Sequence, residues 1–269
     1  MPAFPIPYEP SIHEKKFIEH FGIAGLRLNR KRLHEGLRTY VICFTNRCGS
    51  NLLGELISTN TSFGIAGEYL NAPGVIKICT EKNFKTLQQY LWWLAKRKAS
   101  SEGILGIKLS YRQLFFLAAN DLMPLVFGDV RFIHMQRSDV LRQAVSHVIA
   151  TQTKAWSSQQ ISQLNASDIA FKGNQIVRIM DSIYAANAKF HCFFSVYGIQ
   201  PVRVTYEDLV QDLQTTGDRV IRDLGFPGIK AVSVLPRAVT LKRQSSNLNE
   251  VFAKRVHDRY DRFRSRVTE

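Results

Sequence analysis

Apolar positions along the chain follow two different spacings, one typical of strands and one typical of helices. Short apolar runs rich in β-branched residues predict strands at 39–44, 104–110, 131–136 and 201–206. Helical spacing of apolar residues is found at 12–37, 51–58, 83–98, 140–153, 175–197 and 247–264. Strands that alternate with helices of this length favour a parallel sheet with helices on both faces. The pattern therefore predicts an α/β fold, with run 39–44 buried on both sides.

The periodicity weakens at the N-terminus and in one interior stretch. Residues 1–10 are rich in proline, which favours an extended arm. Residues 156–173 are rich in Ser, Gln and Asn and have little periodicity, so we expect a surface insertion near the site. There is no internal repeat. We predict an N-terminal arm and helix over 1–38 and a single domain over 39–269.

Composition adds an expectation about partners and location. The 36 Lys and Arg against 22 Asp and Glu give a formal charge of +14, which favours an anionic partner: a nucleotide, an acidic glycan, a nucleic acid or a membrane surface. The four cysteines lack the paired spacing of metal or redox sites, and the N-terminus does not resemble a secretory signal. No apolar run is long enough to span a membrane. We expect a cytoplasmic protein with no stable membrane insertion.

The first candidate chemistry lies in the turn after the first predicted strand, which reads TNRCGSN over 45–51. A Walker A loop needs several glycines and a lysine before its Ser or Thr, whereas this turn has Gly49 alone and Arg47 two residues earlier. It suits a compact nest for one phosphate, built from the amides of 48–52, the Ser50 hydroxyl and the Arg47 charge. An ordinary strand-to-helix turn with Ser50 as the N-cap is equally compatible with these residues.

A second pair of residues changes this balance. Arg137 stands at the end of the predicted strand 131–136, and Ser146 follows inside the next predicted helix. An arginine and a serine so placed can grip a second phosphate from the same sheet edge. Taken alone, Arg137 fits a salt bridge or a helix start better than a phosphate site. Together with the first turn, the pair suggests a nucleotide that carries phosphates at two separate places.

The ordered set of motifs resembles that of sulfotransferases that use 3′-phosphoadenosine 5′-phosphosulfate (PAPS), and the nearer match is the bacterial trehalose-2-sulfotransferase-like group. In chain order the motifs are TNRCGSNLL at 45–53, GEYL at 67–70, RSDVLRQAVS at 137–146, YEDL at 206–209 and RQ at 243–244. Cys48 stands where this group usually has serine. The resemblance covers about residues 39–265 and implies a P-loop-like sulfotransferase fold; the first 38 residues have no counterpart.

The resemblance also implies how PAPS is held. The 5′-phosphosulfate end is assigned to Arg47, Cys48, Gly49, Ser50 and Asn51. The 3′-phosphate is assigned to Arg137 and Ser146, with Arg243 and Gln244 closing over the nucleotide. Arg47 counts as catalytic because it would stabilise the leaving phosphate. The effect of Cys48 depends on whether that position contributes only its amide.

Catalysis then needs a base for the acceptor hydroxyl. The resemblance makes Glu68 the candidate, with His147 as the alternative, and no aspartate cluster demands a metal. We predict transfer of a sulfuryl group from PAPS to a carbohydrate, a glycolipid or another small acceptor. Nucleic acid is not expected as a partner, and a homodimer is expected from the family. The rival hypotheses are a non-catalytic basic protein that binds polyanions and, less favoured, an ATP-dependent kinase with a degenerate loop.

Overall fold

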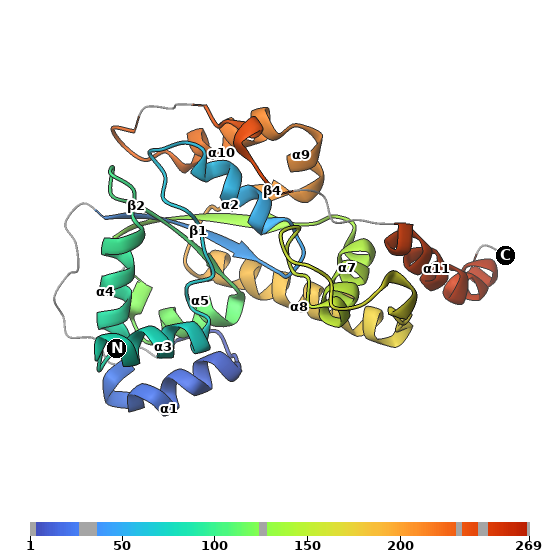
Figure 1. The fold of residues 1–269 in the computed structure, drawn as a ribbon, viewed down its shortest axis with the longest axis horizontal. Helices are drawn as coiled ribbons and strands as arrows, with labels where there is room; N and C mark the ends of the chain where they lie inside the picture. Colours follow the sequence, from blue (N-terminus) through green and yellow to red (C-terminus); the bar gives the residue numbers. More distant parts are fainter. Residues whose placement is uncertain (1–3, 27–36, 124–127, 230–232, 242–246, 268–269) are drawn as a thin grey trace.

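The structure, a computed structural model, describes residues 4–26, 37–123, 128–229, 233–241 and 247–267. Within these residues one sheet of four parallel strands forms the centre of the molecule, in the order β2-β1-β3-β4 (Figure 1). The strands are β1 (Arg38–Phe44), β2 (Ile104–Leu109), β3 (Asp129–Gln136) and β4 (Val202–Thr205). These strands confirm the four predicted from the apolar runs and the α/β class.

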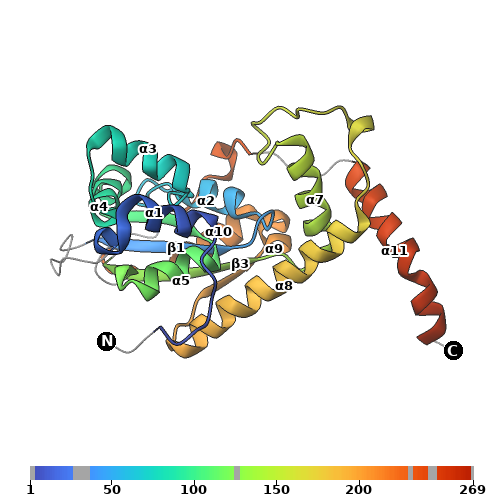
Figure 2. The same ribbon diagram turned by 90° about the horizontal axis from the view of Figure 1, so that it is seen from below.

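Helices cover both faces of the sheet (Figures 1 and 2). One face packs against α1 (Ile12–Leu26), α3 (Ala72–Lys82), α4 (Leu87–Lys98), α5 (Tyr111–Ala119) and α8 (Gly173–Val196). The other packs against α2 (Ser50–Ser58), α9 (Tyr206–Gln211) and α10 (Leu213–Leu224). Alternate residues of β1 enter the two cores: Val41 belongs to the first and Ile42 to the second. The strand is therefore buried on both faces, as its continuous apolar run predicts.

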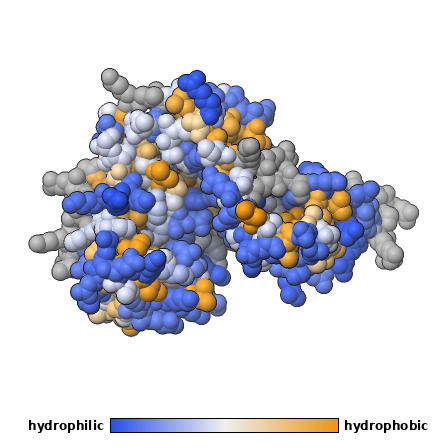
Figure 3. Space-filling model, in the orientation of Figure 1, coloured by the Kyte–Doolittle hydropathy of each residue, from blue (hydrophilic) through white to orange (hydrophobic). Residues whose placement is uncertain are grey.

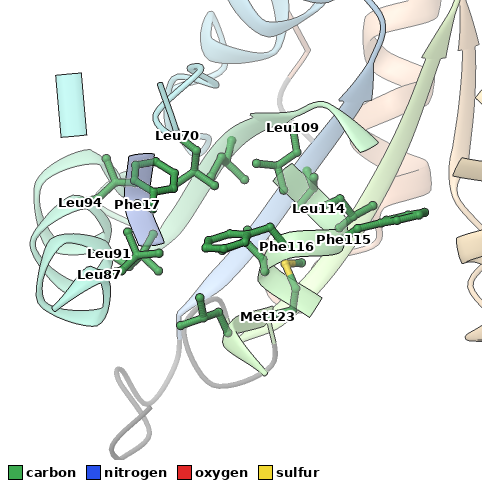
Figure 4. Close-up of a cluster of buried hydrophobic side chains, with 14 of the residues drawn as sticks. Phe17, Leu70, Leu87, Leu91, Leu94, Leu109, Leu114, Phe115, Phe116 and Met123 are labelled. Atoms are coloured by element: carbon green, nitrogen blue, oxygen red, sulfur yellow. The ribbon is translucent and has the colours of Figure 1, made fainter. Parts of the chain in front are cut away.

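The N-terminal helix α1 is part of the first core. Phe17 is fully buried and its ring lies 5.9 Å from that of Phe116 on α5. Leu87, Leu91 and Leu94 of α4 complete this cluster (Figure 4). Burying a phenylalanine in such a cluster is worth about 1.5–3 kcal/mol, so α1 is fastened to the sheet domain by its apolar face.

A third hydrophobic cluster joins α8 to α7 (Val140–Thr153) and α11 (Asn247–Val267). Val148 and Ile176 meet Phe252 and Val256 there. α11 extends away from the sheet domain towards the C-terminus (Figures 1 and 2). On the face shown in Figure 3, hydrophobic residues lie in scattered spots among hydrophilic ones.

Element boundaries differ from the sequence-based expectation in identifiable places. α4 begins at Leu87 and not at 83, because Thr86 and Gln89 form a capping box at its start. The polar stretch 156–173 contains one short 3₁₀ turn, Ala166–Asp168, and most of its residues are exposed. Among the helices of the described residues, none combines the length and the apolar character needed to cross a bilayer.

The strand order determines where a ligand can bind. β1 and β3 are neighbours, and Phe44 pairs with Met135 near their carboxyl ends. The turns that follow, 45–49 and 137–139, consequently lie next to each other at one edge of the sheet. Open parallel sheets bind ligands at this edge, beside neighbouring strands whose connections leave in opposite directions.

Candidate active site

A cavity of about 520 Å³ opens at the carboxyl ends of β1 and β3. Its wall is built by the two turns, by segments 68–71 and 156–158, by Leu241, and by residues of α1, α2, α7, α9 and α11. Its polar lining residues are His13, Asn46, Arg47, Ser50, Asn51, Glu68, Asn71, Arg137, Arg142, Ser146, Ser157, Ser158, Asn249 and Glu250. Trp156 and Tyr206 add aromatic surface.

The turn after β1 presents the amides of the first turn of α2 to this cavity. Gly49 is the N-cap, in the left-handed region with φ 96°, and Ser50 is the first helical residue. The alternative in which Ser50 is the N-cap is therefore wrong. Leu53 N donates to Gly49 O, the first bond of the helix, so the amides of Ser50, Asn51 and Leu52 have no partner within α2. All three residues line the cavity, which makes this helix start suited to an anion.

Cys48 does not share this orientation. Its side chain is fully buried in the second core, and its amide donates to Thr45 O at 3.3 Å within the turn. Burial raises the pKa of the thiol to about 11, so it stays protonated at neutral pH. Of the predicted 5′-phosphosulfate residues, Cys48 is thus the one that the structure keeps out of the cavity; Arg47, Gly49, Ser50 and Asn51 all line it.

Arg47 connects the turn after β1 to α7 and to the polar stretch that follows it. Its Nε donates to Ser146 Oγ at 3.0 Å and its Nη1 to the Trp156 carbonyl at 2.5 Å. Burial, and then the nearby charge of Arg137, lower the pKa of Arg47. The residues predicted for two separate phosphates are thus neighbours in one site, with two guanidinium groups close enough to repel each other.

Arg137 is held in place by two residues at the start of α9. Its side chain is 12% exposed and its guanidinium lies 4.5 Å from the centre of the Tyr206 ring. Glu207 Oε1 is 3.9 Å from Arg137 Nε, and this buried nitrogen has no hydrogen-bond partner among the described residues. Arg137 lines the cavity, so the other nitrogens of its guanidinium can donate to an anion there.

Two side chains fasten the turns to neighbouring helices, Glu207 of α9 to the turn after β3 and Gln143 of α7 to the turn after β1. Glu207, of the YEDL motif in the first turn of α9, accepts hydrogen bonds from the amides of Ser138 and Asp139. Gln143 is fully buried, and its Nε2 donates to Thr45 Oγ1 at 2.9 Å and to Asn46 O at 2.8 Å. The sequence motifs contain both residues, but their role in joining the β1, β3 and β4 ends depends on contacts that the sequence does not show.

Glu68 faces the cavity beside a residue that the sequence interpretation missed. Lys108 of β2 donates from Nζ to Glu68 Oε1 at 3.0 Å and to Asn51 Oδ1. Its side chain is 6% exposed, whereas that of Glu68 is 49% exposed. The signal was available: Lys108 is the one charged residue inside an otherwise apolar predicted strand, 104–110.

The cavity wall beside Glu68 includes Asn71 and, from α1, His13. Ala72 N donates to His13 Nδ1 at 3.3 Å, which leaves the ring Nε2 as a donor in the neutral form. His147, the alternative base, packs its ring edge to face with Trp156, at 5.4 Å between centroids. Burial, and then the charge of Arg47, lower the pKa of His147. It does not line the cavity, whereas Glu68 does.

Arg243 and Gln244 lie outside the described residues. The described residues on either side of that gap, Leu241 and Asn249, both line the cavity. The assignment of Arg243 and Gln244 to the nucleotide therefore stays a prediction, as do the roles of the other site residues.

Comparison with known proteins assigns the chain to a family. The family model of Stf0 sulphotransferases matches residues 39–260. Among solved structures, the chain is similar to the sulfotransferase domain of the Synechococcus PCC 7002 olefin synthase, with 14% sequence identity and a TM-score of 0.44. That match covers 85% of this chain and 96% of the other. No curated protein sequence matches. The family match extends over all four strands and both turns of the cavity, so the chain belongs to the Stf0 sulfotransferase family.

Proposed function

We propose that this protein transfers a sulfuryl group from PAPS to a hydroxyl of a small polar acceptor. The observation that carries the proposal is the pair of arginines at adjacent strand ends. Both arginines, Arg47 and Arg137, line the cavity, and they are close enough for one charge to perturb the other. Two such groups beside the open amides of a helix start suit a ligand with several anionic oxygens.

The donor set matches the two ends of PAPS. The amides of Ser50, Asn51 and Leu52, with Arg47, would hold the 5′-phosphosulfate. Arg137 and Ser146 would hold the 3′-phosphate. The hydrogen bond from Arg47 Nε to Ser146 Oγ, 3.0 Å long, supports this assignment because it joins a residue of one proposed group to a residue of the other. Tyr206, which stacks on Arg137, would border the nucleotide on this side.

Bound PAPS supplies the electrophile, a sulfur that gains a bond to the acceptor oxygen while its bond to the 5′-phosphate oxygen breaks and the electron pair leaves with the phosphate. Glu68 accepts the proton of the acceptor hydroxyl, since its carboxylate is half-exposed to the cavity. Arg47 and the helix-start amides face the negative charge that grows on the departing phosphate. His147 is not needed as a base in this account, because it lies behind Trp156 and outside the cavity lining.

The acceptor would approach from the side of Glu68. Asn71 and His13 line this part of the cavity and offer amide and imidazole groups. Such groups hydrogen-bond to hydroxyls as donors or acceptors, which suits a carbohydrate or a glycolipid headgroup. Arg142 is already paired with Glu250 at 2.7 Å and Asp139 at 3.0 Å, so the acceptor need not be an anion.

The test is transfer of ³⁵S from labelled PAPS to a panel of sugars, glycolipids and small alcohols. We expect one or more of these acceptors to be labelled, and we expect Glu68→Gln to lower turnover about 100-fold or more, since a general base typically contributes about 10²–10⁴. Affinity for 3′-phosphoadenosine 5′-phosphate should remain within about twofold in this variant, because the base does not hold the nucleotide. Glu81→Gln, on exposed α3, is the control that should change neither property.

Two results would contradict this assignment in different ways. Full turnover of Glu68→Gln would exclude Glu68 as the base and leave the reaction in place. A wild-type protein that neither labels any acceptor nor binds the bisphosphate would remove the function itself.

A further inference from the structure

Lys108 is a charged residue inside a strand that is buried along its whole length. Its neighbours Ile107 and Leu109 are fully buried, and the Lys108 side chain is 6% exposed. Removing an ammonium group from water is costly unless partners compensate for the lost hydration. An apolar residue would satisfy the packing of β2, so the lysine requires an explanation beyond the fold.

The side-chain contacts of Lys108 lead to the site. Nζ donates to Glu68 Oε1 at 3.0 Å and to Asn51 Oδ1, and it lies 5.5 Å from the centre of the Phe44 ring. Its backbone amide donates to Gly67 O at 2.9 Å, in the isolated bridge that joins Gly67 to β2. Side chain and backbone of one residue thus hold the segment that carries the candidate base.

The two partners of the Lys108–Glu68 ion pair differ in exposure, and this difference points to function. Lys108 lies beneath the site, while the Glu68 carboxylate is 49% exposed and lines the cavity. Asn51, the other partner, belongs to the first turn of α2, whose amides face the proposed phosphate. The ammonium group of Lys108 therefore links the proposed base to the proposed binding site for PAPS. Lys108 itself does not line the cavity.

We propose that Lys108 is a positioning residue: it fixes the Glu68 carboxylate relative to the phosphate turn, so that the base meets the acceptor hydroxyl in line with the sulfuryl group. This inference rests on the proposed function. Displacement of a reacting group by about 1 Å can cost about 100-fold in rate. The ammonium group acts through Glu68 and Asn51 and does not touch the nucleotide.

The experiment is a double-mutant cycle of Lys108→Met and Glu68→Gln. Methionine keeps the length and apolar stem of the lysine but removes its charge and hydrogen bonds. Lys108→Met should lower kcat about 10- to 100-fold in the wild-type background and less than about twofold in the Glu68→Gln background. Release of sulfate from PAPS, with water as the acceptor, gives the rate if no organic acceptor has been identified.

Two further readouts do not depend on turnover. Calorimetry should give the same Kd for 3′-phosphoadenosine 5′-phosphate in Lys108→Met as in the wild type, within about twofold. A crystal structure of the variant should show the Glu68 carboxylate in a new position or in several. Lys108→Gln, which retains one amide donor, replaces the Met variant if that protein does not fold, and the same pattern is expected.

The proposal is overturned if the rate loss from Lys108→Met is as large with Glu68→Gln as without it, because Lys108 would then act independently of the base. Unchanged kcat, or a bisphosphate Kd raised tenfold, would overturn it as well. Failure of the proposed function looks different: the wild-type protein itself would bind no bisphosphate and release no sulfate.

Discussion

At the scale of single residues, backbone conformation restricts which residues can occupy the turn after β1, residues 45–49. Arg47 has φ 67° and Gly49 has φ 96°, both in the left-handed region. For arginine this conformation costs about 1 kcal/mol, which the bonds to Ser146 and Trp156 offset. A strained residue held by contacts on both sides is typical of a pre-organised ligand site.

Gly49 offers a direct test of this turn. A Cβ at position 49 would lie 2.7 Å from the Tyr206 ring and 3.0 Å from the Met135 methyl group. Gly49→Ala should therefore lower the free energy of unfolding by about 1–3 kcal/mol and weaken binding of the bisphosphate. Urea denaturation and calorimetry measure the two effects.

Gly74→Ala is the matched control, because its Cβ would meet nothing within 4 Å inside α3. That variant should be as stable as the wild type or more stable by about 0.5–1 kcal/mol. If Gly49→Ala behaved like Gly74→Ala, the turn would not require glycine.

Local sequence predicts some of the site and not the rest. Arg47, Ser50 and Arg137 could be predicted to share a sheet edge because each follows a strand, and parallel strands end at the same edge. Lys108 could not be connected to Glu68 in this way. Their contact joins residues 40 apart in sequence and depends on the Gly67 bridge to β2, which no periodicity shows.

At the scale of elements, the apolar pattern found the strands and most of the longer helices but missed α3, α5, α9 and α10. α3 begins with Ala72, Pro73 and Gly74, which hide its periodicity. α5 starts immediately after β2, at a capping box formed by Ser110 and Gln113. This S-x-x-Q signal is readable from the sequence and could have placed the helix start.

The contact between β3 and α8 predicts a pH dependence of stability. His134 is fully buried against Phe190, His191 and Phe194. Burial, then the charges of His191 and Arg203, lower the pKa of His134 from 6.5 to about 4, although Asn187 acts in the opposite direction. Above pH 6.5 the residue is neutral whether the chain is folded or not. As the pH falls towards 4, the unfolded chain binds the proton first and stability is lost.

This histidine should account for up to about 3 kcal/mol of the stability lost between pH 7 and pH 4. Urea denaturation at several pH values measures the loss, and His134→Leu should reduce it. His20→Gln, at an exposed position of α1, should leave the wild-type curve unchanged. Parallel curves for the wild type and His134→Leu would show that burial of His134 does not carry the effect.

At the scale of the whole molecule, parts far apart in sequence form one cavity. The sheet domain supplies the proposed anion site, α11 supplies Asn249 and Glu250, and α1 supplies His13. The family match begins at residue 39, so α1 lies outside it. The division into a segment 1–38 and a domain 39–269 stays a prediction, and we expect α1 to contribute to the choice of acceptor.

His13→Ala tests the contribution of α1. We expect the KM for the acceptor to rise about 5- to 30-fold, because the loss of one hydrogen bond costs about 1–2 kcal/mol of binding free energy. The Kd for the bisphosphate should not change. Steady-state kinetics with varied acceptor concentration measures the first value and calorimetry the second. His20→Ala, on the same helix but away from the cavity lining, is the control. Equal KM values for the two variants would exclude His13 from acceptor binding.

The most direct test of the central claim is a calorimetric titration with 3′-phosphoadenosine 5′-phosphate and with adenosine 5′-phosphate, which lacks the 3′-phosphate. The account predicts tighter binding of the bisphosphate by about 10- to 100-fold, and loss of this preference in Arg137→Ala but not in the exposed control Arg131→Ala. Equal affinity for the two nucleotides, or binding only to polyanions in a salt-dependent manner, would contradict it.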